Sequence, residues 1–415
     1  MLILSLWNAL FSKRKDRPRT TASVCALVMD IPRIQEALRS QKIDGWLFFD
    51  HHERDPLAYR VLGFHPPRHV TRRWFYLIPA TGEPRGLVTR IEAGIIDSLP
   101  GDKRKYSSWQ EQHSELARLL RGTKRVAMQY SPLCAVPYVA MVDAGTVELV
   151  RGQGVEVVSS AELIQEFEAC LSHEQFASHL EAGRRVDKIC AESFRLIGDK
   201  LTNGADELTV RDWVLEQFRQ AGMVTDSGPI VGVNAHAGNP HYEPAPETNA
   251  PIRPGDFVLI DMWAKLDQPD AVFYDITWTG FCGDPPARVR EVFETVRDAR
   301  DRAVQAVATA VDAKRDIHGF EVDDAARNHI RDHGFADHFV HRTGHSIGTE
   351  VHGTGANMDN LETHDERRIL PGALFSVEPG IYLEDFGVRS EVNVFVTANS
   401  ASTTGAVQRE LVRIG

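Results

Sequence analysis

Between residues 30 and 168, short apolar runs alternate with segments in which apolar residues recur every three or four positions. Apolar runs of about four to eight residues are typical of buried strands, and the three- to four-residue period is typical of amphipathic helices. The alternation predicts an α/β domain over residues 30–168. Its strands are expected at Ile43–Asp50, Trp74–Pro79 and Arg125–Tyr130, and its helices at Ile31–Ser40, Glu111–Leu120 and Ala161–Ala169.

The pattern changes after a long helical segment, His173–Leu201, which contains few helix breakers. Because strands and helices no longer alternate strictly, residues 172–415 are predicted to form a second domain, of the α+β class with a mostly antiparallel sheet. Long helices are expected at Asp284–Ala313 and Glu321–His333. Strands are expected at Phe257–Trp263, Ala271–Thr279, Ala373–Val377 and Gly387–Thr397.

One sequence pattern occurs twice in the second domain. A Pro-Gly turn precedes a strand, and a carboxylate lies six residues after the glycine, in PGDFVLID at Asp261 and in PGALFSVE at Glu378. A second acid follows each of them, Asp275 after 14 residues and Glu391 after 13. Side chains alternate between the two faces of a strand, so we expect each pair of acids to share one face of a β-hairpin. The repeat predicts two related hairpin units that present four acids.

The composition is that of an ordinary globular protein, with 42% apolar and 25% charged residues. At roughly 150 residues per domain, 415 residues predict about two or three domains. The formal net charge of −11 argues against a nucleic-acid partner, which requires a basic surface. No apolar run reaches the ~18 residues of a membrane helix, so no membrane partner is expected. The five cysteines form no CxxC pair, which fits a cytoplasmic location.

The first 29 residues follow neither domain pattern. Leu2–Phe11 is apolar and a basic cluster follows it, whereas a secretory signal carries its charge first. We interpret residues 1–29 as a tail that is disordered or that precedes the true start at Met29. A targeting or membrane-surface role is the alternative.

The first domain contains no cluster of residues typical of a catalytic site. His51, His52 and Asp55 lie together after a predicted strand. A pair of histidines at a strand end is more often a surface feature than a site, and we interpret this pair as one.

The four acids of the repeat require compensation for their charge. Asp261 and Glu378 are embedded in apolar strand sequence, and buried carboxylates are rare unless they are paired or bind a metal. Four such groups at one point would raise one another's pKa values, whereas two divalent cations would cancel their charge. His345, in HRTGHSIG, adds an imidazole flanked by glycines. An oxygen-rich site with one imidazole favours Mn, Co, Fe or Zn, and two such ions activate a shared water as a nucleophile.

The second domain resembles a known enzyme family in five ordered segments, namely VLIDMW, YDITWTGF, HRTGHSIGTEVH, FSVEPGIY and GVRSEVNVFVT. They resemble the ligand-bearing motifs of the creatinase/aminopeptidase P/prolidase (M24) family of pita-bread metallopeptidases. The resemblance covers residues 172–415 and implies a pita-bread fold with a pseudo-twofold β-hairpin repeat. Residues 30–168 resemble the smaller α/β N-terminal domain of the aminopeptidase P, prolidase and creatinase members.

The resemblance implies ligands for two divalent metal ions. Asp275 and Glu391 would bridge both ions, and the full matching set is Asp261, Asp275, His345, Glu378 and Glu391. We expect manganese, with cobalt, zinc or iron as alternatives. Glu378 would also carry a proton from the bridging water to the leaving proline nitrogen.

The resemblance also implies catalytic and pocket residues. His241, in NPHYEP, and His341 match histidines of the substrate pocket. His352 matches the histidine that contacts the scissile peptide and stabilises the tetrahedral intermediate. Tyr382 and Arg389 match a pair that orients the first aspartate.

These positions imply a dinuclear metal-dependent hydrolase of Xaa-Pro peptide bonds, a dipeptidase or an aminopeptidase, that uses a metal-bridging hydroxide. The expected partner is a small peptide with proline second, and the resemblance implies a homodimer. Two alternatives are a same-fold enzyme on a small non-peptide substrate, such as a creatinase-like amide hydrolase or an osmolyte hydrolase or lyase, and a non-catalytic interaction module. All five ligand positions are occupied, which argues against the interaction module and against a true creatinase.

The chain departs from the family pattern at two places. The spacing between Asp261 and Asp275 is longer than usual, and we expect the extra residues around Leu266–Ala271 to lengthen the turn without changing the register. Trp278 stands where the family usually has an arginine. Residues Gly344–Gly348 also fit the G-x-S-x-G nucleophile elbow, but the glycine-rich sequence after them is a poor helix, which disfavours that alternative.

Overall fold

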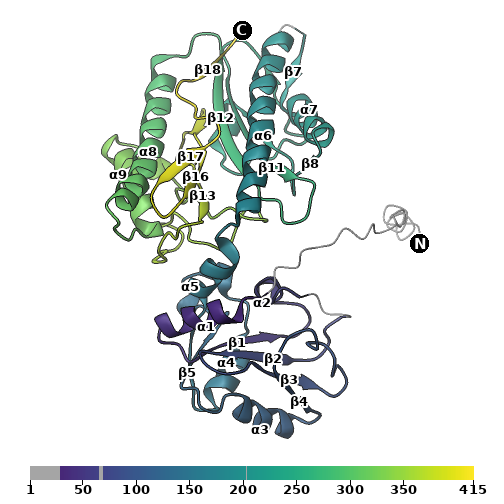
Figure 1. Cartoon of the computed structure of the whole chain (residues 1–415). Coiled ribbons are helices and arrows are strands. Elements are labelled where there is room, and N and C mark those ends of the chain that lie inside the picture. The colour runs from purple at the N-terminus through teal and green to yellow at the C-terminus, as the bar shows by residue number, and fades with distance from the viewer. Residues whose placement is uncertain (1–28, 65–68, 202) are drawn as a thin grey trace, which may run out of the picture.

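The computed structural model describes residues 29–64, 69–201 and 203–415. The chain forms two lobes that meet at the start of the long helix α6 (His173–Lys200) (Figure 1). The predicted tail lies outside the described residues, apart from Met29. No helix in the described part of the chain is long and apolar enough to cross a membrane.

The N-terminal lobe is built on one six-stranded sheet with the order β4-β3-β2-β1-β5-β6. Only β2 runs antiparallel to its neighbours. Every residue of β1 and β2 is buried, which explains their continuous apolar runs, because both faces of this sheet are covered. The strands are β1 Gly45–Asp50, β2 Trp74–Pro79, β3 Arg85–Thr89, β4 Asp102–Tyr106, β5 Arg125–Met128 and β6 Glu156–Ser159.

Helices cover this sheet as the alternation predicts. In α1 the buried residues Ile34, Ala37 and Leu38 recur at the helical period, and Asp30 caps the first turn. The helices are α1 Ile31–Ser40, α2 Pro56–Leu62, α3 Trp109–Leu119, α4 Ala144–Arg151 and α5 Ala161–Ile164, which continues as a π-helical turn over Gln165–Ala169. Two 3-10 turns, Pro132–Cys134 and Pro137–Val139, lie between β5 and α4.

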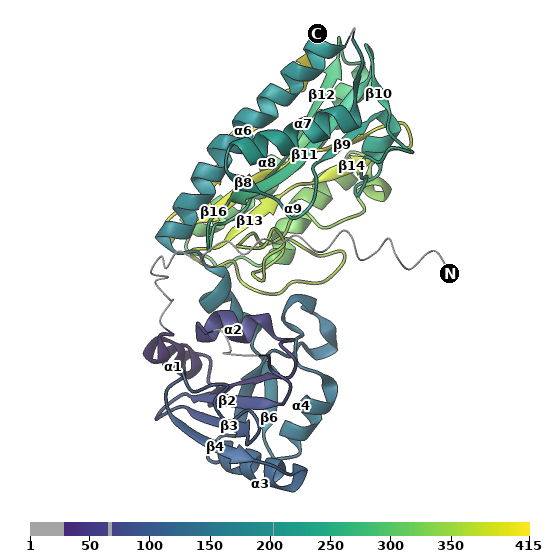
Figure 2. The ribbon, with the colours of Figure 1, turned by 90° about the vertical axis from the view of Figure 1, so that its right-hand side faces the viewer.

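The C-terminal lobe contains several mostly antiparallel strand groups between the helix pair α6/α7 and the helix pair α8/α9 (Figures 1 and 2). One group has the order β18-β12-β11-β8, with β9 also paired to β11. Its strands are β8 Met223–Val224, β9 Ile230–Val233, β11 Phe257–Leu266, β12 Tyr274–Cys282 and β18 Val412–Ile414. The other strands are β7 Ala205–Asp206, β10 Pro251–Ile252, β13 Leu374–Val377, β14 Gly380–Tyr382, β15 Gly387–Arg389, β16 Val392–Val396 and β17 Ala401–Thr404. The helices are α7 Glu207–Gln220, α8 Ala287–Asp312 and α9 Gly319–Asp332.

Strand alternation decides which side chains of the central hairpin face the helices. Val258, Ile260 and Met262 of β11 pack with α6 and α7 in one hydrophobic cluster, together with Tyr274 and Ile276 of β12. The intervening residues of both strands therefore project to the opposite side of the sheet. This side is where the acids of the hairpin lie.

The predicted strand Gly387–Thr397 is wrong as one continuous element. It is divided into β15 and β16 at Ser390 and Glu391. The physical reason is a change of hydrogen-bond partner, because the amide of Glu391 donates to the carbonyl of Thr277 in β12 (3.2 Å). The second acid pair therefore lies on an interrupted hairpin, whose backbone is hydrogen-bonded to the β11–β12 hairpin through Glu391.

Candidate metal centre

The β11–β12 hairpin places its two acids on one face. Asp261 pairs with Thr277, and Trp263 pairs with Asp275, so the two acids are diagonal neighbours across the ladder. The extra residues of this chain lie in the loop between β11 and β12, and the strand register is unbroken. The expected lengthened turn is thus what the structure contains.

The second acid pair lies just beyond the last paired residues of β13 and β16, where Val377 faces Val392. Glu378 follows one strand and Glu391 precedes the other. The hydroxyl of Thr277 donates to Oε2 of Glu391 (3.0 Å), which joins this pair to the first hairpin. Four acids from two β units therefore meet at one place.

His345 reaches the acids from a loop that lies against β13. Its amide donates to Oγ of Ser376 (3.0 Å), and its carbonyl accepts from the amide of Ser376 (2.8 Å). A Cβ atom at Gly344 would overlap the carbonyl oxygen of Ser376, so this close approach requires glycine. Nδ1 of His345 lies 3.1 Å from the carbonyl of Ser346, which assigns the proton to Nδ1 and leaves Nε2 as an acceptor.

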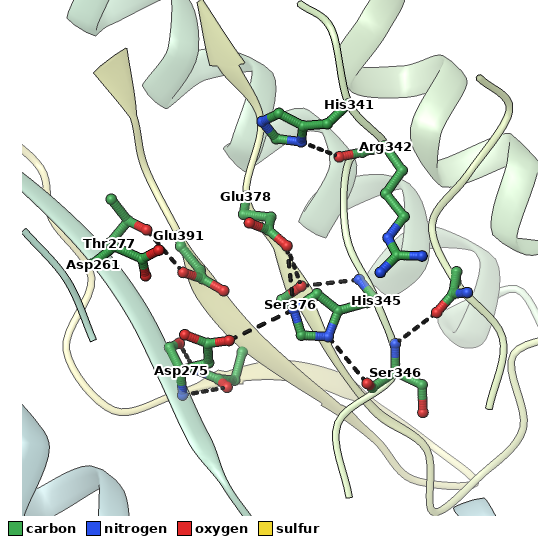
Figure 3. A network of polar contacts seen from close by, with 12 residues as sticks. Asp261, Asp275, Thr277, His341, Arg342, His345, Ser346, Ser376, Glu378 and Glu391 are labelled. Atoms are coloured by element: carbon green, nitrogen blue, oxygen red, sulfur yellow. Dashed lines mark hydrogen bonds and ion pairs between the residues drawn. The ribbon is translucent and has the colours of Figure 1, made fainter. Parts of the chain in front are cut away.

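The unprotonated nitrogen of His345 faces the acids. Nε2 lies 3.3 Å from Oε1 of Glu378 and 3.6 Å from Oδ2 of Asp275. Figure 3 shows the carboxylates of Asp275, Glu378 and Glu391 directed toward one space beside the ring. One ligand atom from each of Asp275, His345 and Glu391 lies within 4.8 Å of the others.

The donor set of this cluster fits divalent cations. Oδ1 of Asp275 and Oε1 of Glu391 are buried and have no hydrogen-bond partner in the described part of the chain. Burial, followed by the charges of the neighbouring acids, raises the pKa of both carboxyl groups well above the ordinary range. Buried acids without partners are costly, and cations would compensate both the charge and the missing contacts. Carboxylate oxygens with one imidazole suit Mn, Co, Fe or Zn.

Asp261 and Glu378 are held by neighbouring polar groups. Nη2 of Arg389 donates to Oδ2 of Asp261. The hydroxyl of Ser376 donates to Oε1 of Glu378 (3.0 Å), and Nε of Arg389 lies 3.9 Å from its Oε2. Arg389 thus orients one acid from each β unit.

A polar chain continues from Arg389 to His341. Nη1 of Arg389 donates to the hydroxyl of Tyr382 (3.0 Å), and this hydroxyl lies 2.7 Å from Nε2 of His341. Nδ1 of His341 donates to the carbonyl of Arg342 (2.7 Å). Burial lowers the pKa of His341 to about 4, so at neutral pH the ring is uncharged and its Nε2 accepts a hydrogen bond from the hydroxyl of Tyr382. These hydrogen bonds fix the tautomer of His341 and the orientation of the Tyr382 hydroxyl.

The two remaining expected histidines lie at the pocket surface. His241 and His352 both line the cavity of about 390 Å³ that contains the cluster, and both are exposed. The His352 ring lies edge-on to the His345 ring, with centroids 4.4 Å apart. The structure therefore brings every expected site residue to one pocket or, for Tyr382, into direct contact with its lining.

Sequence reasoning missed several residues of the pocket, among them Tyr138 and Arg342. Nη1 of Arg342 donates to the hydroxyl of Tyr138 (2.8 Å), which belongs to a 3-10 turn of the N-terminal lobe. Arg342 lies inside the motif that contains His341 and His345. This position could have indicated from the sequence that Arg342 belongs to the site. Tyr138 is 204 residues away along the chain, and no sequence pattern links it to the site.

The nucleophile-elbow alternative does not fit the structure. No helix follows Ser346 among the described residues up to β13. Its hydroxyl accepts from the amide of Gly355 (3.1 Å) and serves the loop that holds His345. Ser346 is therefore a structural residue.

Two lobes with a buried centre of acids and one imidazole define the class of a metal-dependent enzyme. The chain belongs to metallopeptidase family M24, whose family model matches residues 181–398, just over half of its length. The family implies divalent metal ions, in agreement with the donor set of the cluster.

Individual relatives show the same likeness. The chain is 35% identical to the Xaa-Pro dipeptidase of Pyrococcus furiosus over 162 residues, which are 39% of this chain and 43% of that one. It is 32% identical to the Xaa-Pro dipeptidase of Lactobacillus delbrueckii subsp. lactis over 217 residues, 52% of this chain and 55% of that one. The matches thus span about half the length of these relatives.

Solved structures resemble both lobes. Dipeptidase PepE from Mycobacterium ulcerans superposes with a TM-score of 0.67 at 24% identity, covering 92% of this chain and 96% of that one. The prolidase from Pyrococcus horikoshii OT3 superposes with a TM-score of 0.61 at 23% identity, covering 92% and 99%. The predicted pita-bread fold with a smaller N-terminal domain is confirmed.

Proposed function

We propose that this protein hydrolyses Xaa-Pro peptide bonds with two divalent cations bound at the acid–imidazole cluster. The observation that carries the proposal is a pair of buried oxygens, Oδ1 of Asp275 and Oε1 of Glu391, that have no hydrogen-bond partner among the described residues, on two acids that cluster with His345. Membership of family M24 and the names of the Xaa-Pro dipeptidase relatives support the reaction class.

Five residues would hold the ions. Asp275 and Glu391, each with a buried oxygen that has no hydrogen-bond partner among the described residues, would hold them together with Asp261, His345 and Glu378. When bound, two such cations lower the pKa of a water molecule and supply a hydroxide nucleophile at neutral pH. We propose manganese as the metal and a homodimer as the assembly, both because of the family resemblance.

The protein's own residues would perform the proton transfers and position the substrate. Oε1 of Glu378 would receive a proton from the attacking water and return it to the leaving proline nitrogen. His352, beside His345, would donate a hydrogen bond to the carbonyl oxygen as charge develops on it. His241 and His341 would form the polar wall of the pocket around the substrate.

Arg342 supports a dipeptidase rather than an aminopeptidase. Its guanidinium lines the pocket, donates to Tyr138 and forms no ion pair with an acid in the described part of the chain. The carboxylate of a bound dipeptide would pair with this guanidinium, whereas a longer peptide places an amide there. Tyr138, from the other lobe, would hold the guanidinium in position.

The test is hydrolysis of a matched peptide series with Mn²⁺, Co²⁺ or Zn²⁺. Ala-Pro, Ala-Pro-Ala and Ala-Ala are incubated with the wild type and with Glu391→Ala. We expect cleavage of Ala-Pro, slower cleavage of Ala-Pro-Ala, none of Ala-Ala and no activity in the variant. A metal-loaded wild type that cleaves neither proline peptide but hydrolyses a small amide such as creatine would replace this proposal by the non-peptide alternative.

A further inference from the structure

A second cleft lies in the N-terminal lobe and shares no lining residue with the metal pocket. Its volume is about 740 Å³, within the range of roughly 300–1,000 Å³ that small-molecule sites occupy. The walls come from the segments that follow β1, β3 and β4, the segment that precedes β2, and the start of α4.

The position of this cleft in the sheet is the usual one for a ligand site. From β1 the chain builds β2, β3 and β4 on one side and then returns to place β5 and β6 on the other (Figure 1). The strand order therefore reverses at β1. In open α/β sheets, ligands bind outside the carboxyl ends of the strands at such a reversal.

The cleft carries an excess of positive charge in a chain whose net charge is −11. Four arginines line it and the only acid among the lining residues is Asp143, which lies 3.7 Å from Arg54. In the described part of the chain, the guanidinium of Arg72 donates to Thr71, and the backbone amide of Arg72 donates to Glu92. Among the described residues no acid forms an ion pair with the other two arginines of the lining, Arg73 and Arg90.

The positive charge of the cleft affects His51. Burial, followed by the charges of His52, Arg54 and Arg73, lowers the pKa of His51. The imidazoles of His51 and His52 pack against each other, with ring centroids 4.2 Å apart. Both rings therefore add polar surface to the cleft without adding negative charge.

One wall of the cleft is apolar and open to solvent. Trp109 is 64% exposed and Ile91 is 69% exposed, although large apolar side chains are usually covered. Trp109 begins α3, directly after the end of β4. A planar indole beside unpaired guanidinium groups offers a stacking surface next to an anion site.

We propose that this cleft binds a small phosphorylated compound with a planar ring, of the size of a mononucleotide. The phosphate would lie between Arg73 and Arg90, since a dianionic group matches planar guanidinium donors. The ring would stack on Trp109. From the sequence alone we interpret His51 and His52 as surface residues. Under this proposal they would flank a ligand site.

The test is calorimetric titration of the full-length protein with AMP, adenosine and inorganic phosphate in a buffer free of other phosphate. We expect AMP to bind more tightly than either fragment. Arg73→Ala/Arg90→Ala should weaken AMP binding at least 10-fold, and Trp109→Ala should weaken AMP but not phosphate. The matched control, Arg121→Ala/Arg195→Ala, removes two exposed arginines outside the cleft and should leave the affinity unchanged.

Three results would overturn the proposal. One is a wild type that binds AMP no more tightly than about 1 mM. Another is an equal loss of affinity in the control pair, which would show a general charge effect. The third is a wild type that is dimeric and does not bind AMP, together with a cleft variant that is monomeric. That result would show that a second copy of the chain covers the cleft. Peptide hydrolysis, measured in parallel, should be unchanged in all these variants.

Discussion

One guanidinium nitrogen of Arg389 donates a hydrogen bond to the carboxylate of Asp261, and another donates to the hydroxyl of Tyr382. A single side chain from β15 thus orients an acid of the β11–β12 hairpin and a tyrosine of β14. Because Tyr382 also contacts His341, one buried cation connects an expected metal ligand to the pocket wall.

Removal of this cation should weaken metal binding without removing a ligand. We expect Arg389→Met to lower Mn²⁺ affinity by roughly 10- to 100-fold, because residues that orient ligands typically contribute that much. Tyr382→Phe should have a smaller effect, since Asp261 keeps its partner. Calorimetric titration with Mn²⁺ measures both variants, and circular dichroism verifies that they fold. An Arg389→Met protein with wild-type affinity would show that the contact to Asp261 is unimportant for the metal.

His352 should matter for rate and not for metal content. It lies beside His345 at the pocket surface, where under the proposed function it would contact the substrate carbonyl. We expect His352→Ala to retain its metal and lose about 10²-fold or more in kcat, as other removed donors to a developing oxyanion do. His113→Ala, an exposed histidine of the other lobe, serves as the control. Loss of metal from His352→Ala would instead make His352 a ligand.

Arg342 should control the choice between dipeptides and longer peptides. We expect Arg342→Met to raise the KM for Ala-Pro by roughly 10- to 100-fold, the value of a hydrogen bond to a charged group. The KM for Ala-Pro-Ala should change little, because its carboxylate lies elsewhere. Tyr138→Phe should shift the same ratio less strongly. Equal changes for both peptides would disprove the assignment of the carboxylate to Arg342.

Buried His179 should make stability depend on pH. Its Nδ1 donates to the carbonyl of Phe273 and its Nε2 accepts from the hydroxyl of Thr404, both at 2.7 Å. Burial lowers the pKa of His179 to about 4, so between about pH 6.5 and 4 the unfolded chain binds the extra proton and stability falls as the pH falls.

The size of this effect follows from the shift in pKa. The slope approaches ~1.4 kcal/mol per pH unit, which gives roughly 2 kcal/mol between pH 6.5 and 5. Urea unfolding of the wild type and of His179→Gln at pH 7.5 and 5.0 measures it. Between pH 7.5 and 5.0 the free energy of unfolding should fall by roughly 2 kcal/mol less in the variant than in the wild type. An identical fall in both proteins would contradict the prediction.

Local patterns in the sequence predict the helices and the first hairpin because burial follows the period of each element. Ile31–Ser40 coincides with α1, and the alternation around Asp261 and Asp275 places both acids on the expected face. The break at Glu391 could not be predicted, because it depends on a hydrogen bond to Thr277, which is remote in sequence. The contact of Tyr138 with Arg342 could not be predicted either, because the two residues are remote in sequence and meet only where the two lobes contact each other.

The central claim is that the cluster around Asp275 and Glu391 holds two metal ions. The most direct measurement is the metal content of the protein by mass spectrometry after chelation and reloading with Mn²⁺. We expect two ions per chain in the wild type and in Glu410→Ala, an exposed acid of the same lobe, and fewer than one in Asp275→Ala and in Glu391→Ala. A wild type without bound metal, or variants that still hold two ions, would contradict the account.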